Sequence, residues 1–416
     1  MYSTECTWNE SKYILFLINL DKELLTSAIS SNLNIEFIYC ILYGLSELFI
    51  NKKNRDNITI NNINNTTIHT IHYKKYLQSI TNSDYSNREL SNNISSLSLF
   101  NASDNSKLNN NEHDALIIEY YDTYFKEIRN IDEITNDIII NSFLPQKNQN
   151  SIKQMMESKG KSGSFFFHSY DHKFLIKTIT SEELDLFITK FAEPYHKHMM
   201  TYKDSLIIKI YGLYSIIIQG ISEVHFIIMQ NLLNVNHTYI NRIFDLKGCT
   251  IKRKTKNINK VKRIQALKDL DYQWITRVDK TIINFSFDQI EELQYLLKND
   301  LQLFKALKLM DYSLLLIIID FPNNTDSNYD QILSLLGDPK YIGHIYKSRN
   351  EKYIYIIGII DFLQQYNCKK WFENKYKALI YGNDVKKSSS VDSDYYCKRF
   401  FNFIINDVFI YGNEAD

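Results

Sequence analysis

The stretch MDYSLLLIII, residues 310–319, places an aspartate at the head of a long apolar run. A second stretch, GIIDFL at residues 358–363, ends its own apolar run in another aspartate. Uninterrupted aliphatic and β-branched residues of this length indicate buried β-strands. A carboxylate beside such a strand is poorly solvated, so Asp311 and Asp361 need a partner or a chemical role. A capping or turn role is the simpler alternative for each aspartate.

A third stretch, IFDLKGCT at residues 243–250, ends a predicted strand with an acid and a base two positions apart. Asp245 and Lys247 therefore point to the same side of the extended chain, and Gly248 permits a sharp exit. The basic run KRK, with Arg253 at its centre, follows and could hold a phosphorylated substrate or an anionic surface. The alternative is a solvated loop with an ion pair.

A glycine- and serine-rich turn precedes two further predicted strands. The turn GKSGS contains Gly160, Ser162, Gly163 and Ser164, in a chain that has only 11 glycines. Backbone N–H groups in such a turn can approach an anion closely, and Lys177 on the following hairpin can reach a phosphate held there. The turn matches neither GxGxxG nor the Walker A pattern, and an ordinary hairpin turn is the simpler alternative.

A basic amphipathic segment lies nearer the C-terminus. On a helix over residues 368–380, aromatic and aliphatic side chains share one stripe, which Lys369 and Lys370 flank. Such a stripe suits an anionic membrane interface. An ordinary half-buried helix is the alternative.

Helical and strand patterns are intermixed along the chain without a regular βαβ period. Apolar spacing and capping residues predict helices at residues 1–50, 113–141, 181–191, 286–308 and 394–410. Apolar runs predict strands at residues 165–168, 173–179, 207–218, 224–229, 239–245, 310–321 and 353–362. The mixture indicates an α+β fold rather than a doubly wound α/β fold.

Composition places a boundary near residue 111. Residues 51–111 are rich in asparagine and serine, which bury little apolar surface, so we expect a low-complexity linker there. Residues 1–50 are expected to form a helical N-terminal segment of unknown role. All of the motifs above follow the boundary.

Charge and cysteine content exclude several classes of protein. The 416 residues contain 48 lysines and arginines and 48 aspartates and glutamates, a balance that gives no reason to expect nucleic-acid binding. The five cysteines form no CxxC pair, which argues against a disulfide framework and against structural zinc. No apolar run reaches the ~18 residues of a spanning helix, and the N-terminus lacks the pattern of a secretory signal. We therefore expect any membrane contact to be made from outside the bilayer.

In this order, the motifs resemble the phosphatidylinositol phosphate kinase family over residues 112–411. The matching stretches are SGS (162–164), IKT (176–178), KIYGLY (209–214), FDLKG (244–248), KRK (252–254), KDLD (268–271), MDYSLL (310–315), IID (359–361) and YCKRF (396–400). The resemblance implies a two-lobed lipid-kinase fold of the α+β class, with antiparallel sheets and flanking helices. Its N-terminal lobe would take residues 112–233 and its C-terminal lobe residues 234–416, with an activation loop at about 366–394.

The resemblance also implies roles for individual residues. Asp311 would be the catalytic acid or base, and Lys247 and Asp245 would line the active site. Asp361 would bind Mg²⁺, and Lys177 would bind the ATP phosphates. The other implied contacts are the phosphate-covering turn, the adenine-binding connection and the substrate-binding side chains: Gly160, Ser162, Gly163 and Ser164; Met229, Asn231 and Leu232; and Arg253, Lys369, Lys370 and Glu373.

One acidic position indicates the subtype. The stretch KAL at residues 377–379 aligns with the type I pattern and places Glu373 at the acidic position that accompanies phosphatidylinositol 4-phosphate as substrate. The expected reaction is transfer of the ATP γ-phosphate to the 5-hydroxyl of that lipid, giving phosphatidylinositol 4,5-bisphosphate. A 5-phosphate 4-kinase or a 3-phosphate 5-kinase stays open, because residues 383–393 depart from the type I sequence. Cys249 stands where the family usually has serine.

The resemblance implies ATP and Mg²⁺ as cofactors, a phosphoinositide substrate, an anionic membrane surface as a partner and no nucleic acid. The expected location is cytoplasmic, peripheral on the cytoplasmic face of the plasma membrane, and a homodimer is left open. Two other classes are weighed against the kinase. One is a non-catalytic phosphoinositide-binding scaffold, and the other is a protein kinase, which the missing HRD, DFG and APE motifs disfavour.

Overall fold

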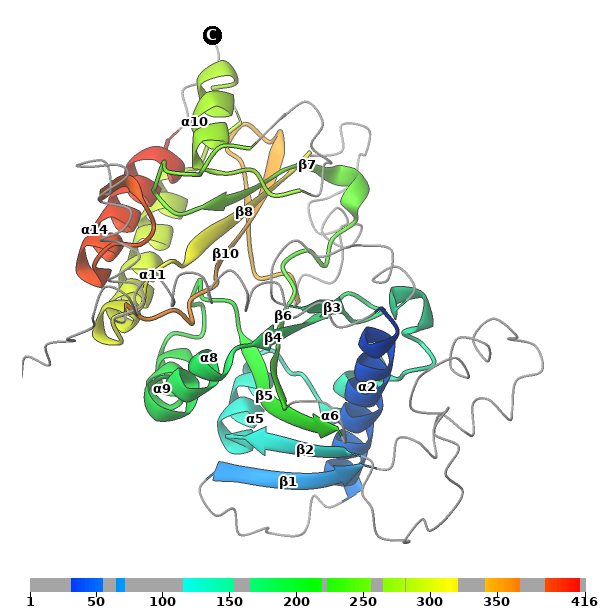
Figure 1. Ribbon diagram of the computed structural model, residues 1–416. Coiled ribbons are helices and arrows are strands. Elements are labelled where there is room, and N and C mark those ends of the chain that lie inside the picture. Colours follow the sequence, from blue (N-terminus) through cyan, green and yellow to red (C-terminus); the bar gives the residue numbers. More distant parts are fainter. Residues whose placement is uncertain are drawn as a thin grey trace, which may run out of the picture. The chain divides into compact units, whose positions relative to one another are not determined.

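The computed structural model describes residues 31–54, 65–71, 115–152, 165–218, 223–255, 265–280, 282–320, 341–366 and 386–411. The chain divides into two compact units, whose elements are labelled in Figure 1. The first unit draws on Met1–Thr123, Glu133–Thr180 and Gly212–Ile228, and the second draws on Tyr124–Asp132, Ser181–Tyr211 and Met229–Asp416. Each unit therefore takes several separate stretches of chain, whereas the sequence suggested two consecutive lobes.

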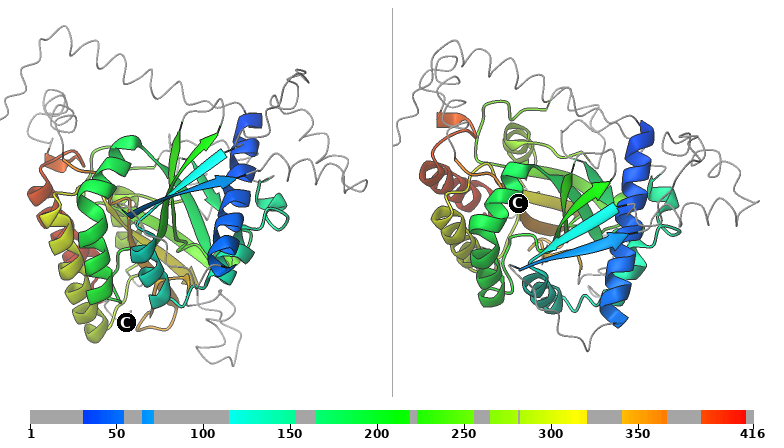
Figure 2. Two further views of the ribbon diagram at one scale, coloured as in Figure 1. Left: turned by 90° about the horizontal axis from the view of Figure 1, so that it is seen from below. Right: turned by 60° about the horizontal axis from the view of Figure 1, so that its bottom comes forward.

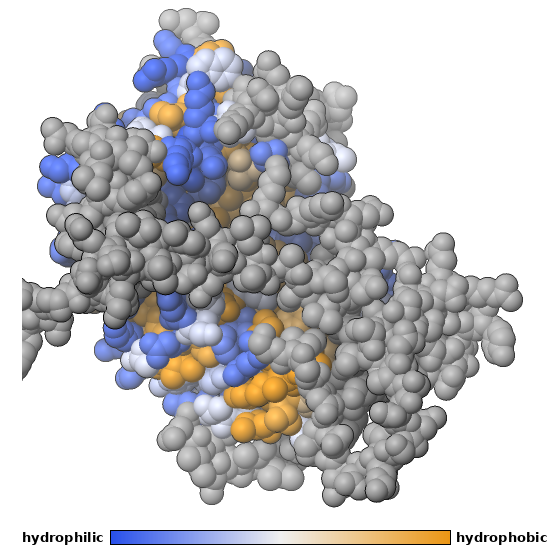
Figure 3. Space-filling view, in the orientation of Figure 1, coloured by the Kyte–Doolittle hydropathy of each residue, from blue (hydrophilic) through white to orange (hydrophobic). Residues whose placement is uncertain are grey.

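The first unit is built around a six-stranded sheet of order β1-β2-β5-β6-β4-β3. Its strands are β1 (Thr66–Ile71), β2 (Ala115–Tyr120), β3 (Phe166–His168), β4 (Phe174–Ile179), β5 (Ile210–Ile218) and β6 (Val224–Gln230). Helices α2 (Ser31–Asn54) and α6 (Asn136–Phe143) contact each other, and α2 runs beside the sheet in both views of Figure 2. In Figure 3, hydrophobic residues gather over the region of β2 and β5.

Two strands of this sheet differ from the expectation. The sequence predicts helix over residues 113–141, but Ala115–Tyr120 is a strand, and helices α5 (Asp122–Ile131) and α6 come after it. The strand forms because it pairs antiparallel with β1 on one side and β5 on the other. β1 lies within the stretch expected as a linker, where its sequence TTIHTI supplies the β-branched residues that favour a strand.

The second unit contains a four-stranded sheet of order β7-β8-β10-β9, in which every neighbouring pair is antiparallel. Its strands are β7 (Ile240–Leu246), β8 (Ser313–Asp320), β9 (His344–Lys347) and β10 (Tyr353–Ile360). β8 and β10 are almost wholly buried, as their uninterrupted aliphatic sequences predict. The segment at Ile207 adds a parallel bridge to Ile359, beyond the short edge strand β9.

Besides most of α5, the second unit contains eight helical elements among its described residues. They are α8 (Ser181–Leu186), η2 (Phe187–Phe191), α9 (Ala192–Thr201), η3 (His237–Tyr239), α10 (Asp269–Val278), α11 (Phe287–Ala306), α14 (Ser393–Phe403) and η7 (Ile404–Val408). The Ser286 hydroxyl caps α11 by accepting from the Gln289 N–H at 3.3 Å. The helix that begins at Ser181 runs on through a π-helical turn to Thr201, beyond the predicted end at residue 191.

These elements confirm the α+β class with antiparallel sheets and flanking helices. The structure also adds α10 and β9, which the sequence did not predict. Over the described ranges, the helices are either too short or too polar to cross a bilayer.

Candidate active site

Three strands of the second unit bring their motif-bearing ends to one end of the sheet. β8 pairs antiparallel with both β7 and β10, and Leu314 near its start lies opposite residues near the last position of each neighbour. The exit of β7, the entry of β8 and the exit of β10 therefore coincide. Lys247 and Asp361 directly follow β7 and β10, and Asp311 lies two residues before β8; we call this the site end of the sheet.

Both aspartates at the site end have a left-handed backbone. φ is 64° at Asp311 and 58° at Asp361. This region costs a residue with a Cβ roughly 1–2 kcal/mol, although aspartate tolerates it better than most. Such backbone strain clusters at functional sites, so its appearance at two paired strand ends supports a functional role for this end of the sheet.

Lys247 and Asp311 form an ion pair across the site end. The Lys247 ammonium donates to the Asp311 carboxylate at 2.7 Å and to the Asp311 carbonyl oxygen at 2.5 Å. Burial opposes the charged form of this lysine, but the carboxylates of Asp311 and Asp245 outweigh it and raise the pKa of Lys247. The site end therefore holds a fixed positive charge at neutral pH, suited to a transferring phosphoryl group.

A buried carboxylate holds the turn that carries Lys247. Asp269, the first residue of α10, accepts through one carboxylate oxygen from the N–H groups of Lys247, Gly248 and Cys249, at 2.8, 2.7 and 3.4 Å. Gly248 adopts a φ of 64°, and a Cβ at that position would lie 3.1 Å from the Cβ of Phe403. The turn therefore needs both the acid beneath it and a glycine at its centre.

Arg253 joins the same cluster. Its Nε donates to the other oxygen of Asp269 at 2.6 Å, and its Nη2 donates to the Asp245 carboxylate at 3.1 Å and to the Asp245 carbonyl. These carboxylates outweigh the effect of burial and raise the pKa of Arg253. The guanidinium thus links the last residues of β7 to α10, which is a structural task in addition to the substrate contact that the family resemblance implies.

Aromatic residues support the entry of β8. Tyr312 is fully buried, its ring lies 4.7 Å from that of Phe304 and 5.0 Å from that of Phe400, and its carbonyl oxygen accepts from the Tyr396 hydroxyl. Because Asp311 comes directly before Tyr312, this packing fixes the backbone that presents its carboxylate. The matching stretch YCKRF on α14 therefore contributes to the site end by packing.

Asp361 has the features of a metal ligand that works together with phosphates. It is exposed at the end of β10 and offers hard carboxylate oxygens, which Mg²⁺ prefers. Within the ranges described, no group of three or more histidine, cysteine, aspartate or glutamate side chains could hold a metal ion. Mg²⁺ commonly takes only one or two carboxylates and completes its shell with substrate phosphates and water, so the residues present fit such an ion.

The predicted phosphate-binding lysine belongs to the first unit. Lys177 lies on β4 of the first unit, opposite Phe166 of β3, with its ammonium 5.7 Å from the centre of the Phe166 ring. The phosphate-covering turn with Gly160, Ser162, Gly163 and Ser164, and the residues Lys369, Lys370 and Glu373, lie outside the described residues.

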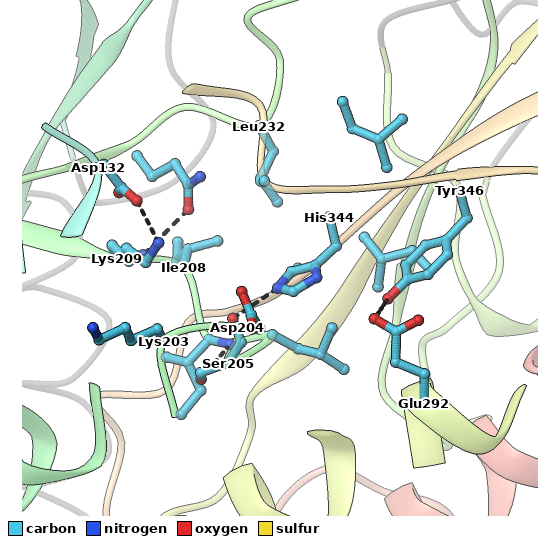
Figure 4. A pocket seen from close by; sticks show the side chains of 17 residues that line it. Asp132, Lys203, Asp204, Ser205, Ile208, Lys209, Leu232, Glu292, His344 and Tyr346 are labelled. Carbon is cyan, nitrogen blue, oxygen red and sulfur yellow. Dashed lines mark hydrogen bonds and ion pairs between the residues drawn. The ribbon is translucent and has the colours of Figure 1, made fainter. Parts of the chain in front are cut away.

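Of the residues expected beside adenine, Leu232 lines a cavity of about 420 Å³ within the second unit (Figure 4). Met229 and Asn231 are buried, and the Asn231 side chain accepts from the Leu233 N–H at 3.2 Å. The cavity wall also holds the Lys209–Asp132 ion pair, at 2.6 Å. It shares no lining residue with the site end, so we do not assign it to the chemistry.

A second buried carboxylate holds part of the wall of that cavity. Asp300 of α11 accepts from His198 at 2.7 Å, from the Ser205 hydroxyl at 2.6 Å and from the Leu206 N–H at 2.8 Å. Ser205 and Leu206 belong to the cavity wall, and His344 binds the Ser205 carbonyl oxygen at 3.0 Å. This cluster orders the segment that precedes β5 but presents no residue to the site end.

Sequence reasoning assigned no role to Asp269 or to its neighbour Asp271, which accepts from the Thr255 N–H at 3.0 Å and from the Lys268 N–H at 3.0 Å. Both acids belong to the matching stretch KDLD, whose two aspartates are the first and third residues of α10. Acidic residues in the first turn of a helix were the available signal. The groups that they bind in the turn at Lys247 and in the basic loop lie 16 or more positions earlier in the chain. Spacing alone could therefore not reveal these partners.

Comparison with known proteins agrees with this geometry. The family model described as phosphatidylinositol-4-phosphate 5-kinase matches residues 147–338 and 336–407. The chain is 29% identical over 329 residues to the phosphatidylinositol 4-phosphate 5-kinase of Plasmodium falciparum, an alignment covering 71% of this chain and 19% of that protein. It is 28% identical over 314 residues to phosphatidylinositol 4-phosphate 5-kinase 4 of Arabidopsis thaliana, covering 61% of this chain and 38% of that protein.

A human relative gives the same result. The chain is 29% identical over 284 residues to the human phosphatidylinositol 4-phosphate 5-kinase type-1 alpha, covering 61% of this chain and 49% of that protein. The chain thus spans half or less of the length of these three relatives.

Proposed function

Because this chain belongs to the phosphatidylinositol-4-phosphate 5-kinase family, we propose that it transfers the γ-phosphate of ATP to the 5-hydroxyl of phosphatidylinositol 4-phosphate, giving phosphatidylinositol 4,5-bisphosphate. The observation that carries the proposal is the meeting of Lys247, Asp311 and Asp361 at the site end of one sheet. The printed names of the relatives support the choice of lipid.

In the proposed reaction, the lipid 5-hydroxyl oxygen forms a bond to the γ-phosphorus, the bond from that phosphorus to the bridging oxygen breaks, and ADP leaves. Asp311 orients the hydroxyl and accepts its proton. Lys247 stays an ammonium because of its raised pKa and stabilises the charge on the transferring group. Asp269 and Arg253 are positioning residues, because they hold the turn that carries Lys247.

For the nucleotide, we assign the ATP phosphates to Lys177 and to the turn with Ser162 and Gly163, as the resemblance implies, and adenine to residues 229–232. Asp361 would hold Mg²⁺, which supplies neutralisation of phosphate charge when bound. The exposed carboxylate at the end of β10 supports this assignment. Asp245, near the end of β7, would line the site beside Lys247, which follows it by two positions.

For the lipid, we assign specificity to Glu373, with Lys369 and Lys370 contacting an anionic membrane surface and Arg253 lying near the substrate phosphate. We place the protein in the cytoplasm, peripheral on the cytoplasmic face of the plasma membrane, because its proposed substrate is a membrane lipid. A homodimer is a further part of the proposal that sedimentation of the purified chain would test.

The test is a panel of phosphatidylinositol 3-, 4- and 5-monophosphates with labelled ATP, followed by identification of the product isomer. The expected result is phosphorylation of the 4-phosphate at position 5, lost in Asp361→Asn. A 3,5- or 4,5-product from another monophosphate would change the subtype. Binding of phosphoinositide vesicles without any ATP turnover would replace the kinase by a scaffold.

A further inference from the structure

Helix α10 exposes an apolar stripe that its own packing does not use. Tyr272 and Ile275 face the interior, whereas Trp274 and Val278 are 58% and 70% exposed. Arg277, three positions after Trp274, flanks this pair and is exposed as well. Exposure of a large aromatic side chain to water is unfavourable in free energy, and a partner that covers the side chain would remove this cost.

Two lysines from the neighbouring loop extend this stripe. Lys252 and Lys254 are exposed, while Arg253 between them points inward to Asp269 and Asp245. The loop is tied to α10 because the Leu270 N–H donates to the Arg253 carbonyl oxygen at 3.0 Å and the Thr255 hydroxyl donates to Asp271 at 2.5 Å. The loop that carries the lysines is therefore held against the first turn of the helix that carries the stripe.

We propose that Trp274, Val278, Arg277, Lys252 and Lys254, which we call the docking face, bind the surface of a bilayer that contains anionic lipids. The choice of a bilayer rests on the proposed function, whose substrate is a membrane lipid. Tryptophan and short aliphatic side chains partition into the headgroup region, and flanking lysines and arginines add attraction to negative lipids.

Charge complementarity favours this occupant over an uncharged or basic protein surface. The docking face carries three basic side chains, and the acidic neighbours of α10 are either buried against the loop, as Asp269 and Asp271 are, or lie at its rear and end, as Asp407 and Asp279 do. Figure 3 shows hydrophilic and hydrophobic residues interspersed over the region of α10, as expected for a helix that meets headgroups.

The position of the docking face gives it a functional consequence. α10 begins at Asp269, which holds the turn that carries Lys247. A ten-residue helix is ~15 Å long, so along the helix axis the stripe lies within that distance of the residue that holds the turn. The docking face would thus act in addition to the contact proposed for Lys369 and Lys370, which belong to a different segment of the chain.

The first experiment measures sedimentation of the full chain with vesicles of phosphatidylcholine and phosphatidylserine that contain no phosphoinositide. Trp274→Ala with Val278→Ala is expected to weaken binding on the order of tenfold, since two apolar side chains lose their burial. Arg277→Glu is expected to weaken it by about fivefold or more. Tyr295→Ala is the matched control, because Tyr295 on α11 is 60% exposed, and it should leave binding unchanged. Unchanged binding in the α10 variants would overturn the inference.

The second experiment reads the environment of Trp274 directly. The chain has only 3 tryptophans, so Trp8→Phe with Trp371→Phe leaves Trp274 as the sole indole fluorophore. Anionic vesicles should shift its emission to the blue and expose it to quenching by brominated lipid. Emission that does not change at saturating vesicle concentration would contradict insertion of this side chain.

A third measurement separates the two proposals. With a water-soluble short-chain phosphatidylinositol 4-phosphate, Trp274→Ala is expected to retain the turnover of the unaltered chain. Normal turnover combined with normal vesicle binding would overturn the docking face and leave the kinase proposal standing. An unaltered chain that binds vesicles through Trp274 but phosphorylates no lipid would do the reverse.

Discussion

Two buried aspartates in the second unit use the same device at different places. Asp269 accepts from three consecutive backbone N–H groups and from Arg253, and Asp300 accepts from His198, Ser205 and the Leu206 N–H. Each carboxylate fixes a backbone segment that no regular strand or helix would hold. The turn on Asp269 carries Lys247 into the site end, whereas the segment on Asp300 only walls a cavity. A buried acid thus marks a rigid position, and the side chain presented above it decides whether chemistry follows.

The largest expected effect comes from comparing the two lysines of these regions. Lys247 and Lys209 are matched, with side chains 14% and 13% exposed and ion pairs of 2.7 and 2.6 Å. Lys247→Met should lower kcat on the order of 10³-fold, because a fixed charge at the transferring group is lost. Lys209→Met should leave kcat within a few-fold. Steady-state kinetics with the lipid substrate distinguishes them, and equal losses would erase the difference between the regions.

The two aspartates themselves give the next effect. Asp269→Asn should lower the free energy of unfolding by roughly 3 kcal/mol, because Arg253 loses a buried partner, and Asp300→Asn should cost roughly 2 kcal/mol. Only Asp269→Asn should also lower kcat, by ~10²-fold, because the turn no longer positions Lys247. Denaturant unfolding measures the first effect. For the second, KM for ATP should stay near its original value while kcat falls, and a parallel change in both would indicate a purely structural role.

A smaller effect tests why only one of the two regions needs a glycine. Gly248→Ala forces a side chain into a left-handed backbone and against Phe403, so it should destabilise the fold by about 1–2 kcal/mol. The segment on Asp300 has no residue with positive φ among Ser205, Leu206 and Ile207, and so imposes no such requirement. Thermal unfolding of the purified variant measures this cost. A melting temperature equal to that of the unaltered chain would show that the turn relaxes freely.

The last effect is absent at neutral pH and appears only in alkali. Burial raises the pKa of the Cys249 thiol from 9.0 to about 11. The unfolded chain therefore ionises this thiol first, and stability should fall between about pH 9 and pH 11 by on the order of 2 kcal/mol. Cys249→Ser should remove this part of the alkaline loss, because a serine hydroxyl does not titrate there. Denaturation curves at pH 7 and pH 10 provide the test, and an identical pH dependence in both proteins would refute it.

The same burial predicts slow chemistry at this thiol. At pH 8, iodoacetamide should leave Cys249 unmodified in the folded chain and modify it in denaturant, as peptide mass analysis would show.

The raised pKa of Lys247 also makes the stability of the fold depend on pH, and only in alkali. Its ion pair contributes fully below the ordinary lysine pKa and is lost only as pH rises through the higher folded value, so it causes no loss near neutrality.

The sequence was sufficient where a motif lies at the end of its own strand. Asp311 and Asp361 border apolar runs long enough to be strands, so their placement at strand ends could be predicted, and the antiparallel register then brings them together. The role of Asp269 could not be predicted in this way, because this residue holds a turn that lies 20 or more residues earlier in the chain. Arg253 shows the opposite problem, because in the sequence the three basic residues of its triplet look alike. A basic triplet in sequence divides in three dimensions into one inward guanidinium and two outward ammonium groups.

Local composition also misled at two places for physical reasons. β1 lies in an asparagine-rich stretch, yet a sheet edge requires only a few β-branched residues with a neighbour to pair with. Residues 115–120 show apolar spacing that also fits a helix, and only their pairing with β1 and β5 settles the matter. Pairing partners from distant stretches are the information that a single sequence does not carry.

The alternation of chain segments between the two units has a consequence for synthesis in the cell. Phe191 leaves the ribosome long before Phe362, on which its ring stacks at 5.7 Å. The second unit therefore cannot complete its aromatic interior until most of the polypeptide has been translated, and the early helices must wait with apolar surface uncovered. The second unit should not be obtainable by removing the start of the gene, because Tyr124–Asp132 belongs to it but precedes Glu133–Thr180 of the first unit. Nascent chains of this protein should therefore bind chaperones readily.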